Sequence, residues 1–148
     1  MNRKAVSIQS VVLIFVGVLC VAVTPLSAQV EIPAGSTITQ ADLSVMALGS
    51  TGETVTVHQI TSDWGESSVT WNSFGGDYDD TALDSFVVTF GWNTVEITTI
   101  VQDWVDGAAP NFGVLLKQGA TPGVQYWSSE YENNYARPML EIGWVDPA

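Results

Sequence analysis

The sequence predicts an all-β protein, an antiparallel β-sandwich of the jelly-roll type with one short helix. After residue 28, roughly seven or eight short segments rich in β-branched and aromatic residues follow one another, separated by turns with Gly, Asn or Asp. Only residues 98–107 replace this pattern with a helical one. The roughly 120 residues that follow residue 28 suffice for one domain with a substantial core.

Alternation of apolar and polar residues places the individual strands. Residues 41–48 alternate small or apolar side chains with Asp42, Ser44 and Met46, which is typical of a strand that is buried on one face. The other expected strands are residues 54–60, 67–71, 85–90, 93–97, 112–117, 124–131 and 136–144.

The expected helix carries start and stop signals of its own. Thr99, with Gln102 three residues later, fits a capping box, and Gly107 fits a C-terminal stop. One face of this helix is apolar, and we therefore expect it to pack on the sandwich. The residues of that face are Ile100, Val101, Trp104 and Val105.

Residues 1–28 have the layout of a secretory signal peptide. Two basic residues precede a long apolar run, and Pro25 then leads to a small residue, Ala28, after which we expect cleavage. Cys20 follows a leucine that is too large for a lipoprotein cleavage site, so a lipid anchor is not expected. An uncleaved membrane anchor is the alternative, because the run is close to the lower length limit for a span. We expect residues 29–148 to be one secreted domain without cysteine.

The charge of the expected mature chain excludes several partners. Lys117 and Arg137 are its only basic residues, against all 16 acidic ones, so two positive charges face sixteen negative ones and the net charge is −14. Nucleic acid is excluded as a partner because phosphate contacts need a cationic face, and adhesion to anionic lipid is excluded for the same reason. A soluble acidic surface suited to a salty exterior is the simple interpretation.

Motifs for catalysis are not recognisable. His58 is the only histidine, no cysteine follows residue 28 and no G-x-S-x-G motif occurs, so a serine triad would have to form around His58. We expect His58 to face solvent or the outer side of its sheet, opposite Val57. Two carboxylates could hydrolyse glycosides, and Glu130, which lies among aromatic residues, is the candidate. Cleavage of a glycan by such a pair of carboxylates is therefore one hypothesis for the function.

Calcium is the one metal for which the sequence offers ligands. Zinc lacks them, because thiols are absent and a single histidine is present after residue 28. Asp77, Asp79 and Asp80 in the loop GGDYDD loosely resemble the start of a calcium loop, without its later Gly and bidentate Glu. A solvated loop without metal is the alternative.

Aromatic residues are the most informative feature, since all six Trp follow residue 28. Flat rings stack on the apolar faces of sugars, but they also fill sandwich cores. We expect Trp104, on the apolar helix face, and Trp71, in phase with Val69, to be core residues. Tyr126 and Trp127 are adjacent on an expected strand and point to opposite faces, so one of them is expected to be exposed.

Four ordered segments carry a family resemblance: IPAGSTITQADLSV, VHQITSDWGESSVTWNS, VEITTIVQDWVDGAAPNFGVLLK and YWSSEYENNYARPMLEI. The chain from Ile32 to Ile142 resembles the DNRLRE domain, which is also classed as carbohydrate-binding module family 96. The pattern from Asp63 to Asn72 and the helix followed by G-V-L-L are its most specific parts. The resemblance implies a secreted, noncatalytic β-sandwich, of which some members bind alginate-like polysaccharides.

Two departures from the family pattern matter. The family domain usually begins with further strands before the segment equivalent to IPAGSTI, so the sheet is expected to lack one or two strands and to have an open edge; a truncated gene or a misplaced start codon is the alternative. Open edges pair with other chains. Secondly, Ser129 precedes Glu130 where the family often has Arg, which makes binding of uronates doubtful because a sugar carboxylate is best held by Arg or Lys.

We therefore predict a secreted carbohydrate-binding module, extracellular or associated with the cell surface. A polysaccharide is expected to lie against exposed aromatic residues, with polar contacts from Glu130 and Lys117. The alternative is a structural extracellular subunit that pairs with another copy or another chain through its open edge and binds no sugar. The aromatic residues of the predicted site are Tyr126, Trp127 and Tyr131.

Overall fold

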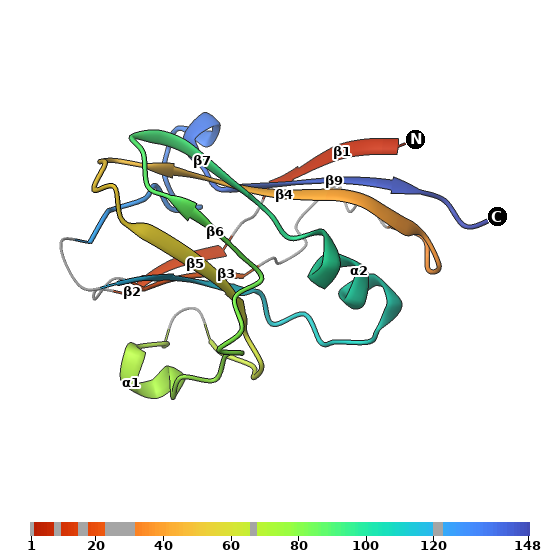
Figure 1. The fold of residues 1–148 in the computed structure, drawn as a ribbon, viewed down its shortest axis with the longest axis horizontal. Coiled ribbons are helices and arrows are strands. Elements are labelled where there is room, and N and C mark those ends of the chain that lie inside the picture. Colours follow the sequence, from red (N-terminus) through yellow and green to blue (C-terminus); the bar gives the residue numbers. More distant parts are fainter. Residues whose placement is uncertain (1, 8–9, 15–17, 23–31, 66–67, 120–122) are drawn as a thin grey trace.

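Two antiparallel β-sheets pack face to face in the computed structural model of the chain (Figure 1). The structure describes residues 2–7, 10–14, 18–22, 32–65, 68–119 and 123–148. The first sheet has the strand order β1-β9-β4-β7 and the second has the order β2-β3-β8-β5-β6. The predicted antiparallel β-sandwich with a short helix is therefore confirmed.

Residues 32–148 contribute three strands to each sheet. In the first sheet these are β4 (Thr37–Ala47), β7 (Gly91–Glu96) and β9 (Met139–Val145). In the second sheet they are β5 (Thr54–Gln59), β6 (Asp84–Val87) and β8 (Val114–Gln118). β6 and β7 are consecutive in the chain, belong to different sheets and contact each other, so they form one side of the sandwich. β8 and β9 lie toward the opposite side.

The N-terminal residues extend both sheets on that other side. β1 (Asn2–Ser7) pairs with β9, and β3 (Val18–Ala22) pairs with β8 and with β2 (Ser10–Ile14). These strands occupy the edges that we expect to be bare once a signal peptide has been removed. Whether residues 1–28 are removed is a question of processing, so the signal peptide stays a prediction, and the expected cleavage site lies outside the described residues.

Two of the expected strands are not strands in the described residues. The end of residues 67–71 leads into the short helix α1 (Trp71–Phe74), because Thr70 and Ser73 form a reciprocal capping box there. Residues 124–131 make only an isolated bridge, between Tyr126 and Ala47. Their serines favour a turn, which the Tyr131 N–H closes on the carbonyl of Ser128 at 3.2 Å.

The longer helix α2 (Thr98–Asp106) confirms the helix expected over residues 98–107, and its buried residues Ile100 and Val101 face the core. Gly107 ends the helix with φ 69°, a left-handed conformation that favours glycine. No helix in the described part of the chain is both long and apolar enough to cross a membrane.

The N-terminus of α2 differs from the expected capping box. The helix has no side-chain cap, and the Gln102 side chain turns to the start of β4 instead. Its Oε1 accepts a hydrogen bond of 2.7 Å from the Ile38 N–H, and its Nε2 donates one of 3.2 Å to the carbonyl of Ser36. Gln102 therefore ties α2 to the first sheet, where it satisfies backbone groups of Ser36 and Ile38 at the start of β4.

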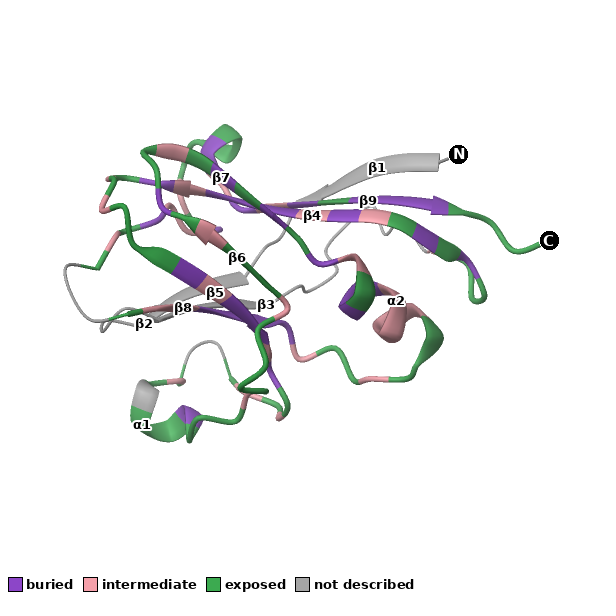
Figure 2. Cartoon of the chain, viewed as in Figure 1, coloured by how far each residue is buried: buried purple, intermediate pink, exposed green. Residues whose placement is uncertain are grey.

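The main core fills the space between the sheets, and buried residues alternate with exposed ones along strands such as β7 (Figure 2). A second, smaller cluster lies on the outer face of the second sheet, beneath residues 61–83. Its buried members are Ile60, Phe74 and Leu115, and Trp64 packs against them while its Nε1 donates to the Phe112 carbonyl at 2.8 Å. The segment that contains Trp64 is therefore architectural.

Candidate functional site

The outer face of the first sheet carries its side chains in rows, because residues opposite each other in antiparallel strands share a face. Trp92 on β7 lies opposite Met46 on β4. The next row along the strands joins Thr94 to Ser44, whose hydroxyls are 2.8 Å apart, and then to Met139 on β9. This face thus begins with an aromatic row and continues with a polar one.

Trp127 and Tyr131 add two rings to the aromatic row. The Trp127 N–H donates to the Met46 carbonyl at 3.0 Å, which places Trp127 on the other side of β4 from Trp92. Its ring stacks on Tyr131 with centroids 3.7 Å apart and an interplanar angle of 10°. We call Trp92, Met46, Trp127 and Tyr131 the aromatic platform. Strand spacing puts Trp92 about 10 Å from Trp127, with Met46 between them.

The backbone around Tyr131 is held by Arg137, whose Nε donates to the Tyr131 carbonyl at 2.7 Å. Arg137 therefore has a structural role at this turn. Glu130, between the two rings of the stack in sequence, is exposed, whereas Ser129 is buried. Of the predicted contact residues, Trp127, Glu130 and Tyr131 therefore lie together at one end of the first sheet.

The turn before β7 is rigid although it carries an exposed aromatic ring. The side chain of Asn93 accepts hydrogen bonds from the N–H and hydroxyl of Thr89, and donates to the carbonyls of Thr89 and Gly91 at 2.9 Å each. Phe90 at the tip is 75 % exposed and Trp92 is 42 % exposed. Because Asn93 is buried and fixes this turn, Trp92 is presented in one backbone geometry.

Replacing Asn93 by Ala is expected to lower the free energy of unfolding by about 2 kcal/mol, since the turn's polar groups lose their partners. Urea unfolding followed by circular dichroism measures the loss. Thr94→Ala, at the exposed neighbouring position, is the control and should cost less than about half of that. Equal stabilities of the two variants would contradict the role of Asn93.

Tyr126 lies in the main core and is 5 % exposed, so its ring cannot contact a ligand at the surface. It bridges to Ala47, whereas its neighbour Trp127 points outward, as alternation requires. The Tyr126 hydroxyl has no hydrogen-bond partner among the described residues. Burial raises the pKa of Tyr126 to about 12.

This pKa predicts a loss of stability in alkali. An unfolded tyrosine ionises near pH 10, whereas folded Tyr126 keeps its proton up to about pH 12, so the stabilising effect is present below pH 10 and is lost as the pH rises through this window. Thermal unfolding of Tyr126→Phe should show a smaller fall in melting temperature between pH 9 and pH 11 than the parent. Parallel curves would contradict the burial of the hydroxyl.

Lys117 lies elsewhere, on β8 of the second sheet. Its Nζ donates to the Tyr78 hydroxyl at 2.6 Å and lies 4.9 Å from the centre of that ring. The hydrogen bond with Tyr78 raises the pKa of Lys117. Lys117 and the aromatic platform therefore belong to different sheets, and the structure does not bring this predicted contact residue to the others.

His58 is on the outer face of the second sheet, as expected, but it is covered and only 4 % exposed. Its Nδ1 lies 2.8 Å from the Asp79 carbonyl, and its Nε2 lies 2.8 Å from the Thr56 hydroxyl. The ring also meets Tyr78 edge-on, with centroids 5.2 Å apart. His58 thus fastens residues 61–83 to the sheet and has no serine beside it among these partners.

Two of the three expected calcium ligands, Asp77 and Asp79, accept hydrogen bonds from nearby residues, and Asp80 is the third. The Asp77 carboxylate accepts a hydrogen bond of 2.8 Å from the Ser62 hydroxyl. Asp79 accepts one of 2.8 Å from the Thr81 N–H, and the hydrogen bonds from Thr81 lower the pKa of Asp79. Within the described residues, no group of three or more acidic, histidine or cysteine side chains is placed to hold a metal ion.

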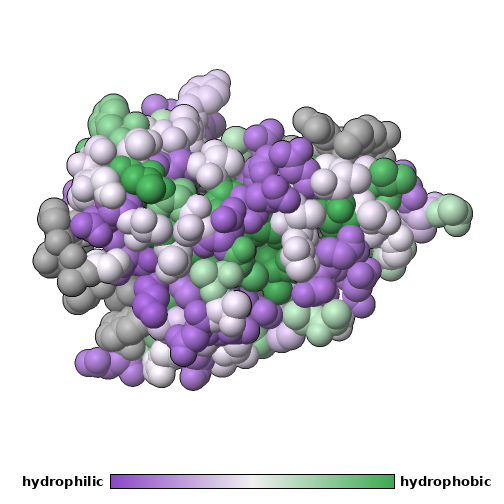
Figure 3. Space-filling model, viewed as in Figure 1, coloured by the Kyte–Doolittle hydropathy of each residue, from purple (hydrophilic) through white to green (hydrophobic). Residues whose placement is uncertain are grey.

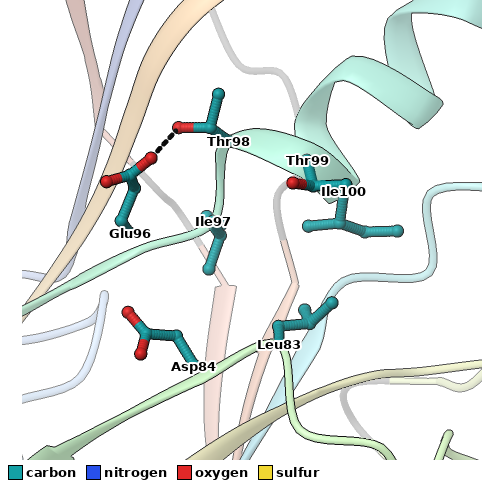
Figure 4. A pocket seen from close by; sticks show the side chains of 7 residues that line it. All are labelled: Leu83, Asp84, Glu96, Ile97, Thr98, Thr99 and Ile100. Atoms are coloured by element: carbon teal, nitrogen blue, oxygen red, sulfur yellow. Dashed lines mark hydrogen bonds between the residues drawn. The ribbon is translucent and has the colours of Figure 1, made fainter.

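A small pocket of about 220 Å³ opens between the ends of β6 and β7 and the first turn of α2 (Figure 4). Leu83, Ile97 and Ile100 provide its apolar wall, while Asp84 and Glu96 approach it from the two sheets. In Figure 3, hydrophobic residues show near the middle of the molecular face, surrounded by hydrophilic ones. The Glu96 carboxylate is already bound by the Thr98 hydroxyl at 2.9 Å. The pocket is smaller than typical ligand sites.

A β-sandwich module with aromatic side chains on the outer side of one sheet is the class of protein that this fold and this surface define. The model of carbohydrate-binding module family 96 matches residues 27–143, and the chain therefore belongs to that family. Its members are carbohydrate-binding modules, typically noncatalytic and generally extracellular. The resemblance seen in the sequence is thus confirmed. A search of curated proteins found no match.

Proposed function

We propose that this protein is a secreted, noncatalytic module that binds a polysaccharide on the outer face of its first sheet. The observation that carries the proposal is the aromatic platform, in which the stacked pair Trp127 and Tyr131 lies in one row with Trp92. Family membership supports a carbohydrate as the ligand. The rings would stack on the apolar faces of sugar units, which loses little entropy because the rings are already ordered.

The platform suits an extended chain better than a single sugar. A sheet face with rings on both sides of β4 offers successive contacts along a polymer, whereas the pocket beside α2 is small, about 220 Å³. Catalysis would need two carboxylates that flank a bond. Glu130 is exposed, which suits a polar contact with a ligand at the surface.

Charge favours a neutral polysaccharide. The third row of the same face consists of Glu96, Asp42 and Glu141, which lie opposite one another on the three strands. Arg137, near the platform, already donates its Nε to a backbone carbonyl. A uronate polymer that crossed this face would meet carboxylates and would have little cationic compensation.

Titration of intrinsic tryptophan fluorescence with a panel of soluble polysaccharides tests the proposal. We expect a shift with at least one neutral glycan and none with alginate at moderate salt. A reducing-end assay on the same samples should show no turnover. Absence of a shift with every neutral and acidic glycan would sink the binding function, and turnover would overturn the noncatalytic assignment.

A structural subunit that pairs through a sheet edge is the second candidate function. The observation that favours it is the pairing of β1 with β9 and of β3 with β8, since both inner strands accept a further strand. If residues 1–28 are removed on export, these two positions are free for another chain. Size-exclusion chromatography with light scattering tests it, and a stable monomer would count against it.

A further inference from the structure

Both strands on this side of the sandwich have the composition of central strands. Natural edge strands are short or carry Lys, Pro or a bulge that discourages pairing. β8 carries one Lys, Lys117, whose Nζ donates to the Tyr78 hydroxyl at 2.6 Å. The strand begins with Val114, Leu115 and Leu116, all at most 2 % exposed, which are covered on both faces, by the main core and by the smaller cluster. A strand that is apolar on both faces is typical of a sheet interior.

β9 has the same character. Leu140, Ile142 and Trp144 point into the core, and Gly143 between them is also buried. Glu141 is the only charged residue in the strand, and it lies on the outer face. Nothing in the strand would discourage pairing along its free side.

The opposite side of the sandwich shows how this protein protects an edge. β6 has only four residues, Asp84–Val87, and none of them is fully buried. β7 alternates with exposed Trp92, Thr94 and Glu96, and α2 follows it directly. The contrast indicates that β8 and β9 require a neighbour on each side, whereas β6 and β7 do not.

In the whole chain the neighbours are β1, which pairs with β9 over six residues, and β3, which pairs with β8 over four. Both strands belong to the segment that reads as a signal peptide. Its removal would uncover two central-type strands together, on one side of the molecule. Two bare strands without edge protection are templates for pairing with another chain.

We propose that the chain that begins at Gln29 forms a symmetric dimer, in which β9 and β8 of one copy pair with β9 and β8 of a second. A two-fold axis perpendicular to the sheets makes β9 antiparallel to β9 of the other copy, and β8 antiparallel to β8 of the other copy. A single axis can generate both pairs because β8 and β9 lie on the same side of the sandwich. The sandwich becomes continuous across the dimer, without any free central strand at its middle.

The register of the β9 pair follows from overlap and charge. With Ile142 on the axis, all seven residues of the strand are paired, and Glu141 faces Gly143 of the other copy. A shift that centred the pair on Glu141 would place two carboxylates opposite each other, which is unfavourable. The register centred on Ile142 therefore sets Met139 opposite Val145 of the other copy, at both ends of the pair.

The dimer rests on the second candidate function, and its tests measure molar mass rather than glycan binding. The first test uses the full-length gene, exported from a bacterial host that processes the chain itself. Intact mass gives the N-terminus, and light scattering gives the molar mass. We expect a chain that begins at Gln29 with twice the mass of one chain. A processed monomer, or a secreted chain that keeps residues 1–28, overturns the proposal.

Two paired variants test the register with matched chemistry. Met139→Lys together with Val145→Lys places like charges opposite each other across the axis, and should weaken dimerisation about tenfold or more. Met139→Lys together with Val145→Glu places opposite charges there, and should dimerise like the parent. Because both carry the same first substitution on an outward-facing site, a folding defect would affect both. Equal dissociation constants for the two variants would overturn the proposed pairing, whatever the glycan titration shows.

Discussion

Trp127→Ala is expected to abolish most polysaccharide binding, with an affinity at least about tenfold lower than that of the parent. The substitution removes one ring of the stacked pair and leaves Tyr131 without the partner at 3.7 Å that orders it. The remaining ring then has to be immobilised by the ligand, which adds an entropic cost to the lost contact. Affinity electrophoresis in gels that contain the bound polysaccharide measures the change.

Two further variants distinguish the effect of losing the stacked pair from the effect of losing any exposed aromatic ring. Tyr135→Ala removes a ring that is 86 % exposed and lies four residues from the stack in sequence, and it should leave affinity within about twofold. Trp92→Ala should have an intermediate effect, because Trp92 reaches the platform from β7 without a stacking partner in the described structure. Unchanged affinity in a folded Trp127→Ala variant would exclude the platform as the binding face.

The sandwich was predictable from the sequence because its strands obey simple alternation. Residues 41–48 coincide with most of β4, and its inward positions are all buried. The helix at residues 98–107 was equally clear, since its apolar face and its terminal glycine agree. Segments with mixed signals failed: Trp71 follows a capping threonine, and that local hydrogen bonding made residues 71–74 helical.

The candidate site was only half predictable. Alternation predicts that Tyr126 and Trp127 point to opposite faces, but the sequence does not say which of them points outward. The bridge to Ala47 turns Tyr126 inward, and Trp127 on the outer face is half-buried rather than exposed. Trp92 was missed although it begins a strand whose alternate residues are buried. Its pairing with Met46 is a contact between distant segments, which a single sequence without an alignment does not encode locally.

The position of Lys117 could not be predicted from the sequence either, because the number of charges does not say where each one lies. With two cations in the expected mature chain, either could be assigned to an anionic or hydroxyl-rich ligand on chemical grounds alone. The register decides otherwise, since Lys117 lies opposite Thr56 in the second sheet and donates to Tyr78. Charge counts indicate the class of ligand, whereas the placement of each charge depends on strand pairing.

Phe74→Ala is expected to be the most destabilising of the substitutions considered, with a loss of about 3 kcal/mol or more in the free energy of unfolding. Phe74 is 3 % exposed and, among the described side chains, shares the smaller cluster with buried Ile60 and Leu115. Truncation to Ala removes most of the apolar contact area between α1 and this cluster and leaves a cavity. The aromatic contact with Tyr78, parallel to Phe74 at 6.5 Å, is lost as well.

The location of this cluster adds a second readout. Phe74 holds residues 61–83 against the second sheet, together with Trp64 and the His58 contact to Asp79. Truncation of Phe74 should therefore release this segment before the sandwich unfolds. Amide exchange should then become faster at Thr61 and Asp79, whose N–H groups donate to the carbonyls of Asp77 and Gln59. The amides of β4 should stay protected. Asn72→Ala, on the exposed side of the same short helix, is the control. Glycan affinity should be unchanged in both variants, because the platform lies on the other sheet. A uniform loss of protection would instead mean that the segment and the sandwich unfold as one unit.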